Sequence, residues 1–346
     1  MFRSSSEIED VLIEAELEPD DARLLAASAK PTIWLKTRAV DSEDKIAIGA
    51  TKIGGRPDLP ASVAWPIRPA YPDIEARTKH LRRDIANPDS AWSWATPEQR
   101  VAFSKESADR IRIVENPFPL GFLAQINFAE MWAAGPLDPD MPRSGVLSLF
   151  FDLIEAPWGF DPNDRVAFAA LFQDVGETLT RRDAPTPIVP SPQEWRLRPL
   201  ACVANPCVTP TPPENVENLG LALSADCVEQ LQDWWGDDDN MYATEGGVDW
   251  KCHRIGGWPT PIQGDMQTEC ALVTAGHYCG DSAAYRAPEL EPVRATASDW
   301  LMLAQIGTDE KGGVTWGDNG QVYVWIRRDD LAARRFDRAH LITQCH

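Results

Sequence analysis

The segment Gly121–Met131 reads GFLAQINFAEM, and the segment Trp300–Glu310 reads WLMLAQIGTDE. Both contain the tetrapeptide Leu-Ala-Gln-Ile, whose glutamine is Gln125 in the first segment and Gln305 in the second. Each tetrapeptide lies in a run of apolar residues, which is typical of a buried β-strand. The two segments are therefore predicted to be equivalent strands of one repeated unit.

The sequences that flank the two tetrapeptides also match, and in the same order. Upstream, Gly54–Pro57 (GGRP) corresponds to Gly256–Pro259 (GGWP). Downstream, Gly145–Phe151 (GVLSLFF) corresponds to Gly320–Ile326 (GQVYVWI). Three matched elements in one order predict an internal duplication that produced two related halves.

A Pro-rich stretch separates the two copies. It contains nine prolines, at positions 185, 187, 190, 192, 199, 206, 210, 212 and 213. This composition predicts an extended linker or long crossover rather than a packed element, with strand character only at Trp195–Arg198. We therefore expect an acidic helical segment at 1–30, a first half at 31–184 with an insertion at about 70–112, a crossover at 185–213, and a second half at 214–346.

Local patterns predict the type of several elements. Acidic residues and helically spaced apolar residues over 7–22, followed by a second helical stretch, predict an N-terminal helical pair. Alternating sequences predict strands at 32–36 and 45–48. The insertion is expected to be mainly helical, because Thr96 followed by Pro97 is a typical helix start.

The chain is strongly acidic, since 53 Asp and Glu against 33 Lys and Arg give a formal net charge of −20 over 346 residues. Such a field repels phosphate backbones and anionic membranes, so neither nucleic acid nor membrane is an expected partner. A basic protein is the partner class that the charge favours, although surplus acid also serves solubility. The short apolar runs, the missing signal sequence and seven unpatterned cysteines predict a cytoplasmic protein with reduced thiols.

Motifs that would name a reaction are missing from the sequence. It contains no phosphate-binding loop, no dinucleotide fingerprint, no His-Glu-x-x-His and no Gly-x-Ser-x-Gly. Cys252, His253, His277 and Cys279 are the strongest zinc candidates, but none belongs to a Cys-x-x-Cys pair. We therefore predict neither a metal site nor a cofactor, and we leave open whether the protein is an enzyme.

Polar and aromatic residues of the second half form the candidate ligand site. They are His253, Gln263, Asp265, Trp316 and Asp318. An acid–base pair would need Asp265 and Asp318 within a few ångströms of each other. Both follow a glycine, which is also typical of a simple turn at a strand end.

Gln125 and Gln305 are polar residues inside apolar strands, and a buried amide requires hydrogen-bond partners. We favour a structural role over ligand binding for both. Each is expected either to bond backbone across a turn or to face the other near a pseudo-twofold axis.

Six segments in order carry a resemblance to a known family. They are GGRPDLPASVAWP, GFLAQINFAEM, SGVLSLFFD, HRIGGWPTPIQGDMQ, LMLAQIGTDE and WGDNGQVYVWIRRDDLAARRFD. Together they resemble the YwqG-like family, a bacterial domain of unknown function, from about residue 30 to 338. The resemblance implies a mainly β (α+β), roll-like fold of antiparallel sheets built from two related halves. It implies no catalytic residue, because the family has no established reaction.

Two classes of function remain open. The first is a non-enzymatic protein-binding module, toxin-neutralising or regulatory, which the acidic charge favours. The second is a small-molecule-binding protein or hydrolase with a site in the groove between the halves, where pseudo-symmetric folds often form pockets.

Overall fold

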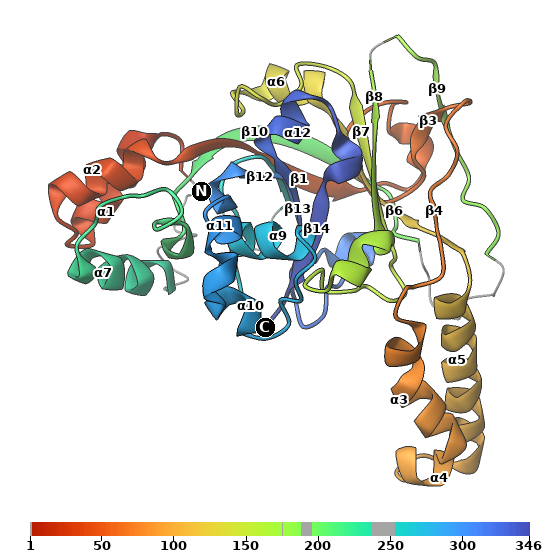
Figure 1. The fold of residues 1–346 in the computed structure, drawn as a ribbon. Coiled ribbons are helices and arrows are strands. Elements are labelled where there is room, and N and C mark those ends of the chain that lie inside the picture. The colour runs from red at the N-terminus through yellow and green to blue at the C-terminus, as the bar shows by residue number, and fades with distance from the viewer. Residues whose placement is uncertain (1, 175, 188–195, 237–252) are drawn as a thin grey trace.

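The structure is a computed structural model that describes residues 2–174, 176–187, 196–236 and 253–346. Ten strands form one sheet in which all neighbouring strands are antiparallel (Figure 1). From edge to edge they are β14 (His340–Gln344), β13 (Gln321–Arg327), β12 (Trp300–Gly307), β11 (His253–Ile255), β1 (Lys30–Ala39), β10 (Leu200–Thr209), β2 (Lys52–Ile53), β6 (Gly121–Asn127), β7 (Val146–Phe151) and β8 (Phe168–Gln173). Two small sheets pair β3 (Asp58–Pro60) with β9 (Leu179–Arg181), and β4 (Ile67–Arg68) with β5 (Phe118–Pro119). The predicted mainly β (α+β) fold is confirmed.

Helices pack around this sheet. The α-helices are α1 (Ser5–Glu14), α2 (Pro19–Ala27), α3 (Ile74–Ala86), α4 (Pro88–Ala91), α5 (Pro97–Glu115), α6 (Phe128–Ala134), α7 (Ala225–Gly236), α9 (Met266–Thr274), α10 (Ala283–Arg286), α11 (Glu291–Arg294) and α12 (Arg328–Ala332). The 3-10 helices are η1 (Glu43–Lys45), η2 (Pro162–Ala167), η3 (Pro213–Asn215), η4 (Pro288–Leu290), η5 (Ala297–Asp299), η6 (Glu310–Gly312) and η7 (Phe336–Arg338). The predicted N-terminal helical pair is α1 and α2, which packs with α7 around Ile8, Leu25 and Leu231. No helix in the described part of the chain combines the length and apolar character needed to cross a membrane.

The two copies of the repeat occupy equivalent places in the sheet. The order β2-β6-β7-β8 on one side of the central β1–β10 pair matches the order β11-β12-β13-β14 on the other. Lys52 lies opposite Gln125 in the first copy. Arg254 lies opposite Gln305 in the second copy. The boundaries of the two halves stay a prediction, but their strands follow one plan.

Backbone details of the two copies also correspond. Gly54 N donates to Leu123 O at 2.9 Å, and both strands that carry the tetrapeptide shift register beside this leucine position. Gly256 N donates to Leu303 O at 3.0 Å in the second copy. Gly54 and Gly256 both have positive φ, a conformation that favours glycine. The same backbone conformation therefore explains why both copies have a glycine at this position.

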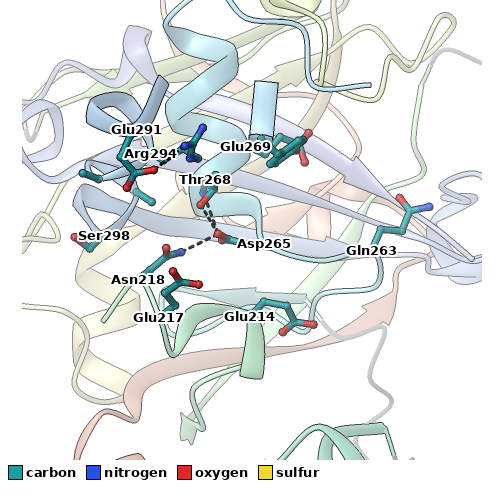
Figure 2. A pocket seen from close by; sticks show the side chains of 13 residues that line it. Glu214, Glu217, Asn218, Gln263, Asp265, Thr268, Glu269, Glu291, Arg294 and Ser298 are labelled. Carbon is teal, nitrogen blue, oxygen red and sulfur yellow. Dashed lines mark hydrogen bonds and ion pairs between the residues drawn. The ribbon is translucent and has the colours of Figure 1, made fainter. Parts of the chain in front are cut away.

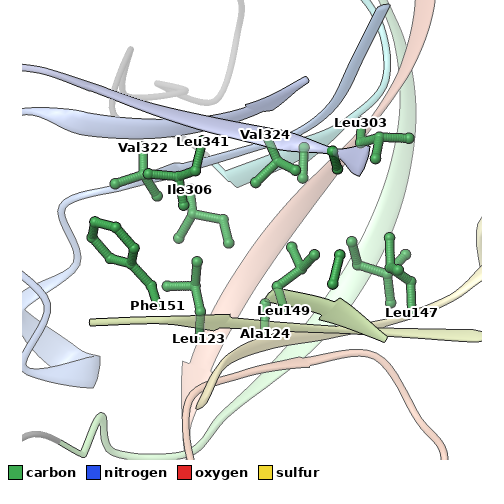
Figure 3. Close-up of a cluster of buried hydrophobic side chains, with 14 of the residues drawn as sticks. Leu123, Ala124, Leu147, Leu149, Phe151, Leu303, Ile306, Val322, Val324 and Leu341 are labelled. Atoms are coloured by element: carbon green, nitrogen blue, oxygen red, sulfur yellow. The ribbon is translucent and has the colours of Figure 1, made fainter. Parts of the chain in front are cut away.

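The main hydrophobic core lies between the two half-sheets. Leu123 and Leu149 of the first half point toward Val322 and Leu341 of the second (Figure 3). All four are buried, and full burial of such a side chain contributes about 1.5–3 kcal/mol. The sheet is thus folded so that the β6–β7 and β12–β13–β14 faces cover each other, in agreement with the predicted roll.

Helix α9 covers the outer face of the second half-sheet. It buries Met266, Cys270 and Ala271 against Trp300 and Met302 of β12. Leu272 and Val273 of α9 are buried in a separate apolar cluster, so polar side chains lie at its first turns, where Thr268 and Glu269 are partly exposed. This placement of α9 decides where the candidate site forms.

The predicted helical insertion forms an arm of α3, α4 and α5 that stands away from the sheet (Figure 1). Helix α5 begins with the expected Thr96 cap, which is part of a capping box with Gln99. At the base of the arm, Arg68 Nε donates to Asp152 Oδ2 at 2.6 Å, and Tyr71 Oη donates to the same oxygen at 2.9 Å. These buried bonds fix the arm to the sheet.

Two local predictions were wrong. Residues 45–48 do not form a strand, because Glu43–Lys45 forms the 3-10 helix η1. Trp195 lies outside the described residues, and 196–198 are not strand. Instead, Leu200–Thr209 forms the long central strand β10, which pairs with β1 over ten positions although it contains Pro206. Pairing with β1 stabilises β10 as a strand, and the local composition of residues 200–209 does not reveal this partner.

Candidate functional site: an acidic cavity beside helix α9

A cavity of about 660 Å³ lies between the start of α9, the short helices α10 and α11, and the segment that follows η3 (Figure 2). Its size falls in the range of small-molecule sites. Five carboxyl side chains line it, namely Glu214, Glu217, Asp265, Glu269 and Glu291. Its lining contains one basic residue, Arg294.

Asp265 is built into the fold at the floor of this cavity. It is the N-cap of α9, where its carboxylate accepts hydrogen bonds from Gln267 N at 2.8 Å and from Thr268 N at 3.4 Å. Asn218 Nδ2 donates to Asp265 Oδ2 at 2.8 Å, and Asn215 Nδ2 donates to Oδ1 at 3.2 Å. Figure 2 shows the bonds from Thr268 and Asn218. Asp265 therefore joins two segments of the cavity wall and keeps its negative charge fixed there.

Glu269 lies one helical turn after Asp265 on the same face of α9. Burial, and after it the charge of Asp265, raises the pKa of Glu269 to about 8, although a hydrogen bond with Tyr285 opposes the shift. This carboxyl group is consequently mostly protonated at neutral pH. Burial and then the charge of Glu269 also raise the pKa of Cys279 to about 12. The cavity thus contains an uncharged acid beside the phenol of Tyr285.

The basic residue of the cavity does not neutralise its other acids. Arg294 Nη2 donates to Glu291 at 2.6 Å, and its Nη1 donates to the carbonyl oxygens of Ala284 and Ala287. Among the residues that the structure describes, no Lys, Arg or His forms an ion pair with Glu214, Glu217, Asp265 or Glu269. Burial raises the pKa of Glu214 as well. The cavity is therefore electronegative, and each proton or cation that enters it relieves repulsion.

A second cavity, of about 510 Å³, adjoins the first and shares Gln263, Glu269 and Tyr285 with it. Trp158 and Phe160, from the predicted first half, line its far side. The shared carboxyl of Glu269 therefore faces both an acidic and a more aromatic compartment.

The structure brings two of the five predicted site residues together. Gln263 and Asp265 line the acidic cavity. Trp316 is buried and lines a separate cavity of about 300 Å³. Asp318 is exposed on a loop and does not line the acidic cavity, so it forms no acid–base pair with Asp265 there.

His253 lies apart from the acidic cavity, buried on β11. Its Nε2 is 3.3 Å from Asp309 Oδ2, which also accepts from Thr37 Oγ1 at 2.5 Å. Burial raises the pKa of Asp309, but the hydrogen bonds from His253 and Thr37 outweigh it and hold that pKa well below its usual range. The His253–Asp309 pair thus joins β11 and β1 to the loop after β12.

The zinc candidates are only partly described. Cys252 lies outside the described residues, and Cys279 Sγ donates to His277 O at 3.6 Å. Within the described ranges, no group of three or more His, Cys, Asp or Glu side chains is arranged to hold a metal ion.

Gln125 and Gln305 make equivalent backbone contacts. Gln125 Oε1 accepts from Asp58 N at 2.9 Å, and Gln305 Oε1 accepts from Thr260 N at 2.9 Å. Both amides therefore tie the segment after the Gly-Gly pair to the repeated strand, and neither lines the acidic cavity.

Sequence reasoning missed most of the carboxyl groups in this cavity. Asp265 and Glu269 lie four positions apart, a spacing that places both on one face of a helix. This spacing could have indicated from sequence that the two carboxyl groups lie close together. Glu214, Glu217 and Glu291 come from separate segments, and only the tertiary fold brings them to α9.

Comparison with known families shows the family to which this chain belongs. A family model described as a domain of unknown function, DUF1963, matches residues 51–345, and the chain therefore belongs to this family. The matched range includes both copies of the repeat and all residues of the acidic cavity. A search of curated proteins found no match.

Proposed function

We propose that this protein is a non-enzymatic binding module whose acidic cavity receives basic side chains of a protein partner. The observation that carries the proposal is a cavity of about 660 Å³ in which the carboxyl groups of Glu214, Glu217 and Asp265 have no cationic partner among the described residues. A lysine or arginine side chain supplies the missing charge. An arginine can also bind carboxylate oxygens through two parallel hydrogen bonds.

The charge of the whole molecule supports the same partner class. A net charge of −20 accelerates encounter with a basic protein and slows encounter with an acidic one. Exposed ion pairs contribute only about 0–1 kcal/mol each, and Glu214 and Glu217 are exposed, so binding is expected to draw on several such pairs together with the half-buried Asp265. Salt should weaken the complex.

The cellular role belongs to the proposal too. A basic protein whose active surface is covered by this module would be neutralised or regulated, and we propose a toxin-neutralising or regulatory role. We also propose that the chain is a YwqG-like bacterial protein of the cytoplasm, which the resemblance in sequence and the free thiols of the described cysteines support.

The proposal is tested by affinity capture from a lysate of the source organism with three forms of the protein. The cavity variant is Glu214→Gln/Glu217→Gln. The matched control, Asp10→Asn/Glu14→Gln, removes two charges from the exposed face of α1. Wild type and control should capture the same basic protein in stoichiometric amounts, and the cavity variant should lose it. Equal capture by the cavity variant, or no stoichiometric partner for any form, would reject the proposal.

A second candidate function is a small-molecule-binding protein or hydrolase. It is favoured by Glu269, because a carboxyl group with a pKa of about 8 beside Tyr285 and Cys279 is typical of functional sites. The adjoining cavity, which residues from both predicted halves line, would hold the ligand. A metabolite that raises the melting temperature of wild type but not of Glu269→Gln would favour this function over protein binding.

A further inference from the structure

A cavity of different character lies at the end of strands β12, β13 and β14. Its volume is about 470 Å³. The strands contribute Trp300, Arg327 and His340, η2 contributes Arg165, and η7 contributes Arg338. In a chain with a net charge of −20, three guanidinium groups thus surround one cavity.

The acidic groups that line this cavity are too few to neutralise its basic groups. Asp330 is the acidic residue in the lining, and it is held mainly by Arg335, whose Nε lies 2.6 Å from it. Arg338 Nε is 3.9 Å from the same carboxylate. Arg327 pairs with Asp299 at 2.8 Å outside the lining. The cavity therefore has an excess of positive charge.

Arg165 contributes a third positive charge, which interacts electrostatically with the carboxylate of Asp337. Its guanidinium donates to the carbonyl oxygens of Phe168 and Asp337. Within the described residues it forms no ion pair with an Asp or Glu side chain. Its side chain is exposed, so an anion can approach it from solvent.

Trp300 lies in the wall of the cavity, where its indole ring can report on what enters. The residue is 2% exposed, and its Nε1 has no hydrogen-bond partner among the described residues. Because this nitrogen is itself enclosed from solvent, the indole serves as a reporter of the cavity and not as a ligand-binding group.

The other polar groups in the cavity lining do not repel an anion strongly enough to prevent its binding. His340 Nε2 is 2.9 Å from Gly159 O, and burial lowers the pKa of His340 to about 4, so the ring is neutral at pH 7. The carboxyl end of α9, which contributes Thr274, opposes an anion through its helix dipole. That dipole corresponds to about half a charge and is weaker than three guanidinium groups.

We propose that this cavity is a binding site for a small anion that carries a phosphate or carboxylate group. Arg165, Arg327 and Arg338 supply the charge that binds it. Guanidinium groups suit both head groups because they bind two oxygens at once. The site does not rest on the proposed role of the acidic cavity, with which it shares no lining residue.

The test uses the full chain with ¹⁵N-labelled tryptophan. The indole resonance of Trp300 is identified by its loss in Trp300→Phe. Inorganic phosphate and succinate are then titrated separately to about 10 mM, which detects a dissociation constant in the millimolar range. Sodium chloride at matched ionic strength is the control.

We expect a saturable shift of the Trp300 resonance with phosphate or with succinate, and the one that binds more tightly identifies the head group. Arg338→Gln, which alters an exposed side chain, should weaken binding at least about fivefold. Arg286→Gln, an equal change of charge outside the cavity lining, should leave binding unchanged. No saturable shift, a shift that chloride reproduces, or equal binding by Arg338→Gln would overturn the proposal.

Discussion

Glu269 follows Asp265 by one turn of α9, and the charge of Asp265 adds to burial in raising the pKa of Glu269 to about 8. Asp265 stays in place because the helix needs its carboxylate as an N-cap. A structural requirement of the fold therefore sets the protonation state of a neighbouring group in the cavity.

This relationship predicts a pH dependence of stability. The pKa of Glu269 is higher in the folded state than its ordinary value of 4.5, so its contribution is fully present below about pH 4.5. The contribution is lost as the pH rises through about 8. Glu269→Gln should therefore raise the free energy of unfolding at pH 9 by about 1–3 kcal/mol and change it little at pH 4.

Urea denaturation at both pH values measures this effect. Glu229→Gln, an equal change on the exposed surface of α7, is the control and should follow wild type. An unchanged pH dependence in Glu269→Gln would contradict the assignment of the raised pKa to Glu269.

The second prediction concerns the repeated glutamine. In Gln305→Leu the buried backbone N–H of Thr260 loses its acceptor, which should lower the free energy of unfolding by about 1–3 kcal/mol. Gln125→Leu should lower it similarly through Asp58 N. Urea denaturation compares both with Gln230→Leu on the exposed side of α7, and a cost no larger than that of this control would refute the structural role.

The third prediction concerns the core between the half-sheets. Leu123 and Leu303 are buried at equivalent positions, so Leu123→Ala and Leu303→Ala should each lower the free energy of unfolding by about 2–5 kcal/mol. Val203→Ala changes a residue that is 57% exposed and should cost at most about 0.5 kcal/mol. A cost for only one of the two leucines, measured by chemical denaturation, would argue against an equivalent role in the shared core.

The fourth prediction concerns the base of the helical arm. Arg68→Met leaves the buried Asp152 carboxylate without its cation and should destabilise the fold by about 3–5 kcal/mol. The double variant Arg68→Met/Asp152→Leu should recover much of this loss, because it removes both buried charges. Arg112→Met on the exposed face of α5 is the control. Thermal unfolding measures the stability of all three variants. If the second substitution does not restore stability, the unpaired charge is not the cause of the destabilisation.

The sequence revealed the parts of the fold that are encoded by repetition and local pattern. Gln125 and Gln305 marked equivalent strands, which the structure shows as β6 and β12. The central strand β10 was missed because its stability comes from ten paired positions on β1, which the Pro-rich local composition conceals.

The candidate site was harder to predict from sequence, because it also depends on contacts between segments that are distant in the chain. Gln263 and Asp265 were singled out as polar residues of the second half, with Asp265 directly after a glycine. Glu214, Glu217 and Glu291 belong to three segments with no common pattern, and packing of η3 and α11 around α9 brings them together. Asp318, which lies beside a repeat motif, is placed elsewhere on an exposed loop.

Direct measurement of cation binding by the acidic cavity tests the central claim. Isothermal titration calorimetry with a hexa-arginine peptide compares wild type, Glu214→Gln/Glu217→Gln and the charge-matched Asp10→Asn/Glu14→Gln. We predict saturable binding that is weakened at least about tenfold in the cavity variant and retained in the control. Equal affinity of the two double variants would mean that net charge alone attracts the peptide, and it would contradict the assignment of basic-partner binding to this cavity.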